Sequence, residues 1–389
     1  MSDPHFDDFD IHKPGAREEA ESVWTLLRDA PGLAHCKRYG GFHIAARYAD
    51  MKAALMNHGL FASGAGITLP PATTRSRHIP AETDQPLHKE YRGVMQRTLM
   101  PDRISPLEPA VRDIVIELLD AFKSERIDLF SAFARPLPVY VMLHFLGLPR
   151  KDGPMIDKLV EDLHEEVASG LPRGAGPKLT SYAEDVIRNR TPSGDDFVST
   201  VLRGEVDGRP LSFDEQANMV RQVLIGAFDT TSLTLAAAVW WLAQHPADAQ
   251  RLRGEPGIMN AATEEMVRFA SASTYLRRTV TADAVFAGTQ LREGDYVLLA
   301  FGAANRDPTV FPEPDTLVLD RKPNLHLGFG MGVHRCIGSH LAKLQLRVAL
   351  EELLKRYDLA LDGGEAIAFS TGLGQGIVKL PLNLSRRAG

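Results

Sequence analysis

The stretch "GFGMGVHRCIGSHLA", from Gly328 to Ala342, places a cysteine, Cys336, after a glycine-rich turn and at the predicted start of a helix. Gly330, Gly332 and Gly338 allow backbone conformations that other residues avoid, and they leave room for a bulky group beside the chain. The dipole and the free N–H groups of a helix start favour the thiolate form of a cysteine. The stretch therefore combines an ionisable sulfur with space next to it.

Three interpretations of this cysteine follow from its surroundings. A lone cysteine in a turn is usually structural. His334, Cys336 and His340 carry metal-binding groups, and the last two are one helical turn apart, but the stretch lacks a fourth ligand and a C-x-x-C pair. The third interpretation is an axial thiolate ligand of haem iron.

The composition is that of an ordinary globular protein. The chain has 389 residues, of which 44% are hydrophobic and 24% charged, and its formal net charge is -6. The negative charge argues against nucleic acid as the main partner. Cys36 and Cys336 are too few for a disulfide framework, and the acidic start "MSDPHFDDFD" lacks the pattern of a signal peptide. We therefore expect a reducing, cytoplasmic setting.

One apolar segment, Val223 to Ala243, is long enough to cross a membrane. Asp229 within it would cost about 2.5–3.5 kcal/mol at mid-bilayer. Ser212 and Glu215 form a capping box before the segment, and Pro246 follows it, as in a helix of a soluble protein. We therefore expect a long helix buried in a globular domain and no membrane association.

The hydrophobic periodicity predicts one domain over residues 1–389 that is mainly α with a small β portion. Proline- and glycine-rich stretches indicate loops, and no composition shift marks a domain boundary. The predicted segments are a hairpin over 33–47, loops over 62–84 and 169–179, helices over 86–270, short strands over 274–301, an irregular stretch over 305–326 and a helix over 338–357.

The segment "FGMGVHRCIG", Phe329 to Gly338, fits the pattern Phe-Gly-x-Gly-x-His-x-Cys-x-Gly at every fixed position and resembles the haem-ligand loop of the cytochrome P-450 family. The resemblance implies that Cys336 is the thiolate ligand of haem iron, that Phe329 packs beside it and that His334 reaches a haem propionate. It also implies the fold of that family, with haem b between a long central helix and the helix after the cysteine loop. Further motifs extend the resemblance over residues 84 to 345.

The segment "GAFDTT", residues 226–231, resembles the oxygen-binding groove of the family's central helix. Gly226 and Ala227 are small where a diatomic ligand must fit. A threonine hydroxyl can bond back to the carbonyl one turn earlier and distort the helix. The resemblance implies that Thr230 is the alcohol of the oxygen site and that Asp229 is its proton relay.

Glu265 and Arg268, in "EEMVR", lie three residues apart and share one face of a helix. Taken alone, such a pair is usually a solvated surface ion pair. In the family the pair is buried together with an arginine from the segment before the cysteine loop, and Arg321 has that place here. The resemblance implies that these three residues form a structural network rather than a catalytic one.

The segment "DQPLHKEYR" resembles the family pattern Asp-Pro-Pro-x-x-His-x-x-x-Arg, with Gln85 in place of the first proline and with one fewer residue before the histidine, as in some members. His88 and Arg92 lie one helical turn apart, and the resemblance implies that they bind one haem propionate. Arg278, in "RRTVTAD", would bind the other, with Arg277 as the alternative. Cations are needed because two carboxylates of haem become buried, and arginine suits that task.

The resemblance implies a haem-thiolate monooxygenase that inserts one oxygen atom from O2 into a small, largely apolar organic substrate, by hydroxylation or O-dealkylation. The sequence contains no flavin or nicotinamide fingerprint, so electrons would come from a separate iron–sulfur ferredoxin, or a flavodoxin, with its own reductase. A basic patch on the cysteine side would meet such an acidic carrier. The candidates are Lys89, Arg97, Arg103, Arg335, Lys343 and Arg347.

The substrate pocket is expected to combine the 62–84 loop with residues that face the haem in the family. Polar groups among them indicate a substrate with an oxygen-containing group. The candidates are Gln222, Ile225, Gly226, Thr274, Tyr275 and the segment from Leu373 to Gln375.

Other functions are open to a haem-thiolate protein. A peroxide-driven peroxygenase is one alternative, although such members usually lack an acid–alcohol pair like Asp229 and Thr230. A non-enzymatic haem-thiolate sensor is another, but an oxygen groove and a proton relay would serve no purpose in it. The same relay argues against a member that rearranges or dehydrates its substrate without dioxygen.

Overall fold

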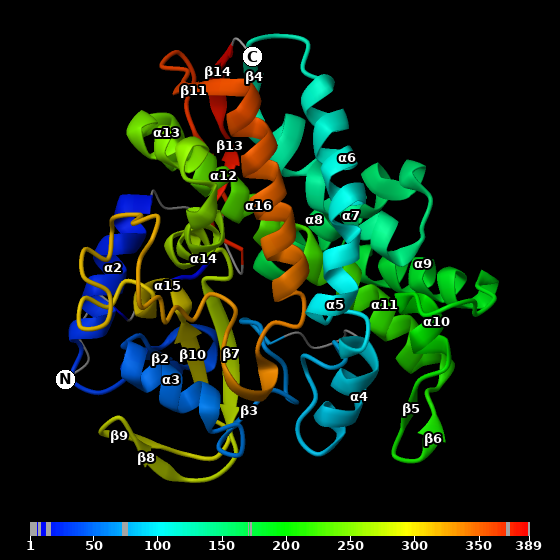
Figure 1. Cartoon of the computed structure of the whole chain (residues 1–389). Coiled ribbons are helices and arrows are strands. Elements are labelled where there is room, and N and C mark those ends of the chain that lie inside the picture. Colours follow the sequence, from blue (N-terminus) through cyan, green and yellow to red (C-terminus); the bar gives the residue numbers. More distant parts are fainter. Residues whose placement is uncertain are drawn as a thin grey trace.

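The computed structural model describes residues 6, 9–12, 17–71, 77–169, 171, 173–370 and 374–387. Helices are the commonest elements among these residues and gather around α12 and α16, with a small sheet beside them (Figure 1). The mainly helical fold with a small β portion is therefore confirmed. The helices are α2 (Arg17–Asp29), α3 (Tyr48–Met56), α4 (Leu87–Gln96), α5 (Pro101–Ile104), α6 (Glu108–Asp120), α7 (Pro136–Leu146), α8 (Gly153–Ser169), α9 (Ala175–Asn189), α10 (Phe197–Leu202), α11 (Phe213–Ala227), α12 (Asp229–Gln244), α13 (Pro246–Gly254), α14 (Met259–Ala270), α15 (Phe301–Ala304) and α16 (Ser339–Arg356).

The strands form one five-stranded sheet, one three-stranded sheet and three two-stranded ladders. The predicted hairpin over 33–47 is confirmed, since Ala34 lies opposite Ile44 in an antiparallel pair that forms one edge of the larger sheet. The larger sheet has the order β1 (Ala34–Cys36), β2 (Phe42–Ala45), β10 (Tyr296–Ala300), β7 (Tyr275–Val280) and β3 (Phe61–Ala62). The other strands pair as β11 (Tyr357–Leu361) and β4 (Arg126–Asp128) on either side of β14 (Pro381–Arg386), β12 (Ala368–Phe369) with β13 (Ile377–Lys379), β5 (Glu205–Val206) with β6 (Arg209–Pro210), and β8 (Ala284–Phe286) with β9 (Thr289–Leu291).

The long apolar helix predicted in the middle of the chain is present as α11 and α12, which meet at a bend at Phe228. The capping box is confirmed, because Ser212 accepts from the N–H of Glu215 while the carboxylate of Glu215 accepts from the N–H of Ser212. Over Phe213–Gln244 the most apolar window is 67% buried inside the protein. The helix is therefore a core helix, as its single charge indicated.

The helix after the cysteine, α16, crosses the helical part of the molecule and packs against α6, α12 and α14 (Figure 1). Its apolar side chains, such as Leu346, Leu350 and Leu353, are fully buried in the main core. This packing holds the start of α16, and Cys336 before it, in the interior. The cysteine loop lies there beside α4 and β7 (Figure 1).

Candidate active site

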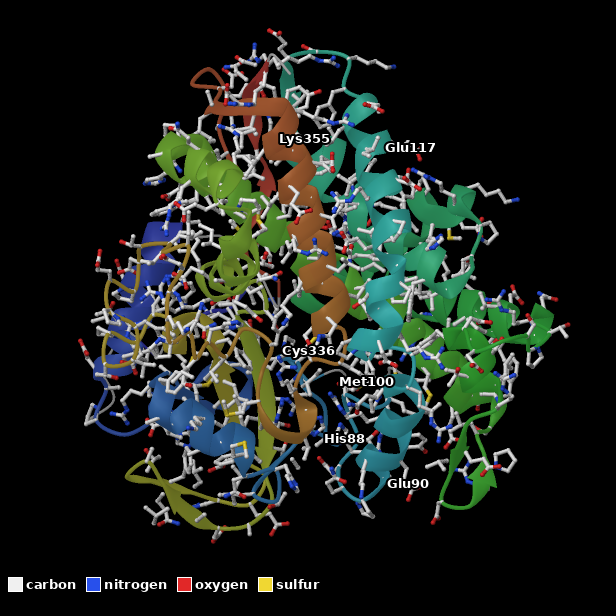
Figure 2. The ribbon with its side chains drawn as sticks, in the orientation of Figure 1. His88, Glu90, Met100, Glu117, Cys336 and Lys355 are labelled. Atoms are coloured by element: carbon white, nitrogen blue, oxygen red, sulfur yellow. The ribbon has the colours of Figure 1, made fainter. Side chains whose placement is uncertain are left out.

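A cavity of about 310 Å³ lies between α4, the α11–α12 pair, β7 and the cysteine loop at the start of α16. Cys336 and His88, which Figure 2 labels near the centre of the molecule, both line it. Its charged or titratable lining groups are basic, and among the residues that the structure describes no carboxylate lines it. The cavity wall is therefore mainly apolar, and basic residues are the source of its charge. The basic lining residues are His88, Arg92, Arg278, His334 and Arg335.

The cysteine loop closes on itself through the backbone. The N–H of Cys336 donates to the carbonyl oxygen of Phe329 at 2.7 Å. Gly332 has φ +71°, and a Cβ there would lie 2.6 Å from the carbonyl oxygen of Leu55 at the end of α3. Only glycine satisfies both conditions, so the motif glycine fixes the loop against α3. Gly338 differs, because its φ is -84° and a Cβ there would meet nothing within 4 Å; its small size leaves the cavity open instead.

The Cys336 side chain lies deep in the protein yet is accessible, because it faces the cavity. Burial raises the pKa of its thiol, and the N–H groups of Gly338 and Ser339 and the guanidinium groups of Arg335 and Arg92 act in the opposite direction. The N–H groups at the helix start thus favour the thiolate, as predicted, but burial outweighs them in the protein without a cofactor. A metal cation at the sulfur reverses that balance, because the thiolate is the ligating form.

The four predicted propionate-binding residues come together on one side of this cavity. The rings of His88 and His334 lie 4.1 Å apart between centroids, and Arg92 donates to the carbonyl oxygen of Arg335 at 2.7 Å. Burial lowers the pKa of His88 to about 4, that of His334 to about 3 and that of Arg278 to about 10. The two histidines are therefore neutral near pH 7, and the buried guanidinium of Arg278, which has no described carboxylate in the lining, favours an anionic ligand. The two carboxylates of haem fit this requirement.

Strand β7 presents alternate residues to the cavity. Leu276 and Arg278 line it, whereas Arg277 donates to the carbonyl oxygen of Ala65 at 2.5 Å and lies over the ring of Tyr296. The alternation of a strand therefore selects Arg278 over Arg277 as the arginine that faces the cavity.

Two predicted pocket residues lie outside the cavity lining. Tyr275 points away from the cavity, where its hydroxyl accepts from Nε1 of Trp24 at 2.9 Å in a separate hydrophobic cluster. Its prediction assigned the wrong face, because the phase of a strand depends on its neighbours in the sheet. Thr274 comes before the strand, is buried outside the lining and donates to the carbonyl oxygen of Ser271 at 3.1 Å, so its hydroxyl bonds back to the preceding turn instead of entering the cavity.

On α11 and α12 the residues that line the cavity are one turn apart. Gln222, Gly226 and Thr230 share this face, with Ala227 beside them, while Ile225 packs against the main core and was predicted wrongly. Val223 and Thr231 line the cavity as well, so the lining face is centred near Val223 and Ala227, and at 100° per residue Ile225 lies on the opposite side of the helix.

The expected back-bonding of hydroxyl groups occurs one turn after the predicted position. The hydroxyl of Ser232 donates to the carbonyl oxygen of Phe228 at 2.8 Å, and that of Thr234 donates to Thr230 at 2.7 Å. The helix bends at Phe228 itself. Such bonds bend helices. The bend therefore lies within the motif of residues 226–231, as predicted, but the hydroxyl that bonds to the carbonyl at the bend belongs to Ser232 rather than to a threonine.

Asp229 starts α12 but does not line the cavity, and both of its carboxylate oxygens contact cationic groups. Oδ1 accepts from Arg135 and Oδ2 contacts Nδ1 of His164. Arg135 also pairs with Asp157 at 2.6 Å. Sequence reasoning missed these partners. The only signal was the seven-residue spacing of Asp157 and His164 on one helix face.

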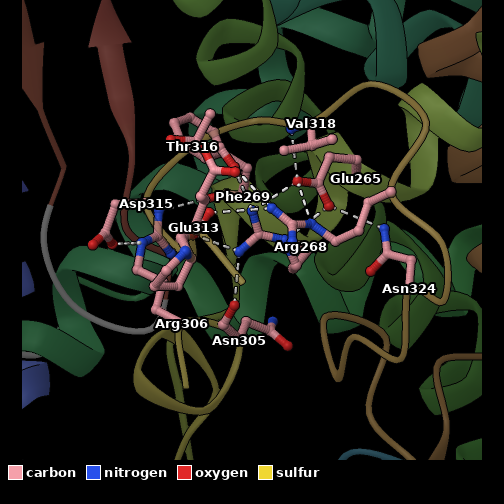
Figure 3. A network of polar contacts seen from close by, with 12 residues as sticks. Glu265, Arg268, Phe269, Asn305, Arg306, Glu313, Asp315, Thr316, Val318 and Asn324 are labelled. Atoms are coloured by element: carbon pink, nitrogen blue, oxygen red, sulfur yellow. Dashed lines mark hydrogen bonds and ion pairs between the residues drawn. The ribbon is translucent and has the colours of Figure 1, made fainter. Parts of the chain in front are cut away.

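Glu265, Arg268 and Arg321 form one network around a fully buried carboxylate (Figure 3). Arg268 donates to Oε1 and Oε2 of Glu265 at 2.7 and 2.8 Å, and Arg321 donates to Oε1 at 2.9 Å. Asn324, which the sequence did not single out, donates to Oε2 at 3.1 Å. The network lies outside the cavity lining and connects α14 with the segment before the cysteine loop.

The rest of the cavity wall is mainly apolar. The 62–84 loop contributes Ile67, Pro80 and Ala81, and the predicted Leu373 lies outside the described residues. Gln375, predicted with it, donates to the carbonyl oxygen of Ile11 at 3.0 Å instead. Sequence analysis missed several lining residues, because no pattern along the chain distinguishes an apolar side chain in a cavity wall from one in the core: Met95, Leu99, Met142, Val223, Leu276 and Phe301.

The six candidate basic residues divide into two groups. Lys343 pairs with Glu264, and Arg347 pairs with Glu108; a third, Arg103, lies 3.5 Å from an exposed aspartate. These three are partly neutralised. Lys89, Arg97 and Arg335 are exposed and have no ion pair with a described carboxylate.

Comparison with known proteins agrees with this geometry. The cytochrome P450 family model matches residues 155–257 and 257–385. Erythromycin C-12 hydroxylase of Saccharopolyspora erythraea is 33% identical and aligns over 88% of this chain and 86% of its own length. The methyl-branched lipid omega-hydroxylase of Mycobacterium tuberculosis is 31% identical over 95% of this chain and 89% of its own.

A solved structure is similar over nearly the whole fold. The structure of a mutant of P450 EryK in complex with erythromycin B covers 97% of this chain and 100% of that chain, with a TM-score of 0.87 and 29% identity. Sequence, fold and the cysteine-lined basic cavity thus agree. The chain belongs to the cytochrome P450 family of haem-dependent monooxygenases.

Proposed function

We propose that this protein inserts one atom of O2 into a small, largely apolar organic substrate, by hydroxylation or O-dealkylation. The observation that carries the proposal is the cavity itself, where one cysteine faces an apolar space with basic residues and no described carboxylate in its lining. The hydroxylases among its relatives support the reaction class, and they act on substrates as different as erythromycin and methyl-branched lipids.

The residues of the cavity would divide the work of holding haem b. The Cys336 thiolate would ligate the iron, with Phe329 beside it in the lining. His88, Arg92, Arg278 and His334 would bind the two propionates, the arginines as cations and the histidines as N–H donors, since these side chains face the cavity without described carboxylate partners there. Haem held in this way supplies the activation of dioxygen and the transfer of one oxygen atom.

Asp229 and Thr230 would transfer protons at the cavity wall opposite Cys336. Gly226, Ala227 and Thr230 line the cavity, and the two small residues leave space for dioxygen. The Thr230 hydroxyl would hold a proton on the cavity side, and Asp229 would connect that side to the exterior. This arrangement favours the monooxygenase over a peroxygenase, which has no need of a proton path from solvent.

Substrate recognition would rest on an apolar wall with few polar groups. Gln222 lines the cavity and is our candidate for contacting an oxygen-containing group of the substrate. Electrons would come from a separate ferredoxin or flavodoxin with its reductase, in the cytoplasm. The whole chain, residues 1–389, would act as one domain.

The first experiment is a spectral titration of the purified ferric protein. A panel of macrolides, terpenoids, aromatic acids, fatty acids and steroids is added while the Soret band is followed. A blue shift identifies a compound that enters the cavity and displaces water from iron, and product formation with O2 and a surrogate ferredoxin then supports the proposal.

A Cys336→Ser variant is the control for the ligand. It should lose the red-shifted Soret band of the reduced, carbon-monoxide-bound protein, while far-ultraviolet circular dichroism stays unchanged. A retained thiolate spectrum in this variant would refute the assignment of Cys336. Product formation with hydrogen peroxide but not with O2 would favour the peroxygenase, and no oxidation of reduced nicotinamide with any compound would favour the sensor.

A further inference from the structure

Asp229 belongs to a charged cluster that joins three separate parts of the fold. His164 comes from α8, Arg135 lies between the π-helical turn η3 (Phe130–Ala134) and α7, and Asp229 is the first residue of α12. Oδ1 of Asp229 accepts from Arg135, and Oδ2 contacts Nδ1 of His164. Asp157, on α8, pairs with the far side of Arg135 at 2.6 Å.

The cluster spans the distance between the cavity and the protein surface. Thr230, the neighbour of Asp229 in the chain, lines the cavity. The side chain of Asp229 is 19% exposed, whereas that of His164 is 33% exposed. His164 therefore contacts Asp229 with one ring nitrogen while part of its ring reaches solvent.

The charges in the cluster decide which member carries a proton. Burial alone would raise the pKa of Asp229, but its contacts with His164 and Arg135 outweigh burial and lower it to about 2. At neutral pH Asp229 is therefore a carboxylate without a proton to give. The same carboxylate and Asp157 outweigh burial and raise the pKa of Arg135, so that arginine keeps its protons. Of the two side chains that contact Asp229, the imidazole of His164 can both give and accept a proton, whereas the guanidinium of Arg135 keeps its protons.

We infer that His164 is the proton-carrying residue of this site and that it delivers protons from solvent to the cavity through Asp229. The inference rests on the proposed function, because it assigns the entry point of the protons which that reaction consumes. The His164 imidazolium gives its Nδ1 proton to Oδ2 of Asp229, and Asp229 passes a proton toward the Thr230 side. The neutral ring then takes a new proton from solvent. Each cycle of transfer therefore moves one proton inward and leaves the cluster unchanged.

Arg135 has a different task in this scheme. It cannot carry a proton, but it holds Oδ1 and leaves Oδ2 to His164. Asp157 balances the charge of Arg135, so that the carboxylate of Asp229 stays shared between one fixed cation and one exchangeable donor. Arg135 is thus a positioning residue.

The test compares His164→Gln with His144→Gln. Glutamine retains an N–H that can donate to Asp229 but cannot carry a proton, so a purely structural role survives this change. His144 is an exposed histidine on α7 and serves as the matched control. With O2, a surrogate ferredoxin and the compound of largest Soret shift, we expect H164Q to lose about 100-fold in turnover, while H144Q remains at the wild-type rate.

Two further readouts separate proton delivery from loss of structure. The solvent deuterium isotope effect on O2-driven turnover should be larger in H164Q than in the wild type. Hydrogen peroxide brings its own protons, so peroxide-driven product formation by H164Q should equal that of the wild type. Wild-type O2 turnover in H164Q, or an equal loss with both oxidants, would overturn the inference.

A spectroscopic measurement needs no turnover at all. In 15N-histidine spectra of the reduced, carbon-monoxide-bound protein, the signal absent from H164Q should show a protonated Nδ1 at neutral pH. A bare Nδ1 would place the proton on Asp229 and overturn the inference. If the wild type forms no product with either oxidant, the proposed function fails, and this spectrum still decides where the proton resides.

Discussion

Arg278 is buried in the wall of the cavity, and no described carboxylate lies beside it in the lining. Its charge therefore lowers the folding stability of the haem-free protein. Its pKa is lowered to about 10, chiefly by burial; the charge of Asp84 opposes this effect and that of Arg277 adds to it. A buried cation of this kind favours whatever anion can enter the cavity. The same buried charge thus destabilises the haem-free protein and strengthens the binding of a cofactor with two carboxylates.

Replacing Arg278 with leucine should therefore separate cofactor binding from folding. We expect the rate of haem transfer to apomyoglobin to rise about 10-fold or more, since a hydrogen bond to a charged group is worth about 1.5–3 kcal/mol. The haem-free variant should unfold at the same or a higher denaturant concentration than the haem-free wild type. Arg292→Leu, at an exposed turn before β10, is the control and should change neither quantity. Unchanged haem retention in R278L would contradict the assignment.

At the scale of elements, the Glu265 network holds α14 to the irregular segment that leads to the cysteine loop. Arg268 donates to the carbonyl oxygens of Asn305, Pro314 and Thr316, in addition to its bonds with Glu265. One helix residue therefore satisfies several backbone groups of a segment without regular structure. This explains how an irregular stretch can carry a ligand loop with a fixed geometry.

The neighbouring glutamates on α14 provide a matched pair for this element. Glu265 is fully buried, whereas Glu264 is 35% exposed and pairs with Lys343. Glu265→Gln should cost about 3–5 kcal/mol of unfolding free energy, because it leaves buried guanidinium groups uncompensated. Glu264→Gln should cost less, about 1–3 kcal/mol, because it weakens a partly exposed contact with Lys343 and a hydrogen bond with the mostly buried ring of His326. Guanidinium-induced unfolding of the haem-loaded proteins measures both, and equal costs would show that burial is not the deciding factor.

At the scale of the whole molecule, the net charge is -6, which would repel the proposed acidic carrier. The carrier can therefore approach only where the surface is locally basic. Lys89, Arg97 and Arg335 are exposed on segments that include the cavity wall. Figure 2 places Cys336 and Lys355 at opposite ends of α16. The molecule therefore offers one basic end near the cofactor and a distant end for comparison.

Lys89→Glu should lower kcat/KM for the carrier about fivefold at low salt, since a single rim charge contributes up to about 1 kcal/mol. The effect should shrink as ionic strength rises, because salt screens exposed charges. Lys355→Glu makes the same change in net charge at the other end of α16 and should have no effect on kcat/KM. Equal losses in the two variants would mean that overall charge, rather than the cysteine-side surface, controls the encounter.

The sequence by itself determined those features that depend on neighbours along the chain. The glycines and Cys336 in one short loop, the capping box before α11, the hairpin of β1 and β2 and the pairing of Glu265 with Arg268 are all confirmed as local arrangements. Spacing along the chain determines the backbone conformation of short segments, and it determines which residues share a face of a helix. The long, apolar α11–α12 helix followed in the same way from its composition.

Tertiary structure alone decided which faces meet. It placed Leu276 and Arg278 of β7 toward the cavity and turned Tyr275 away, which the pattern along the strand left open. It also brought Arg135 and His164, from distant parts of the chain, onto Asp229. Burial, and with it every pKa shift in the site, depends on such contacts between remote segments, because water is excluded only when those segments pack together.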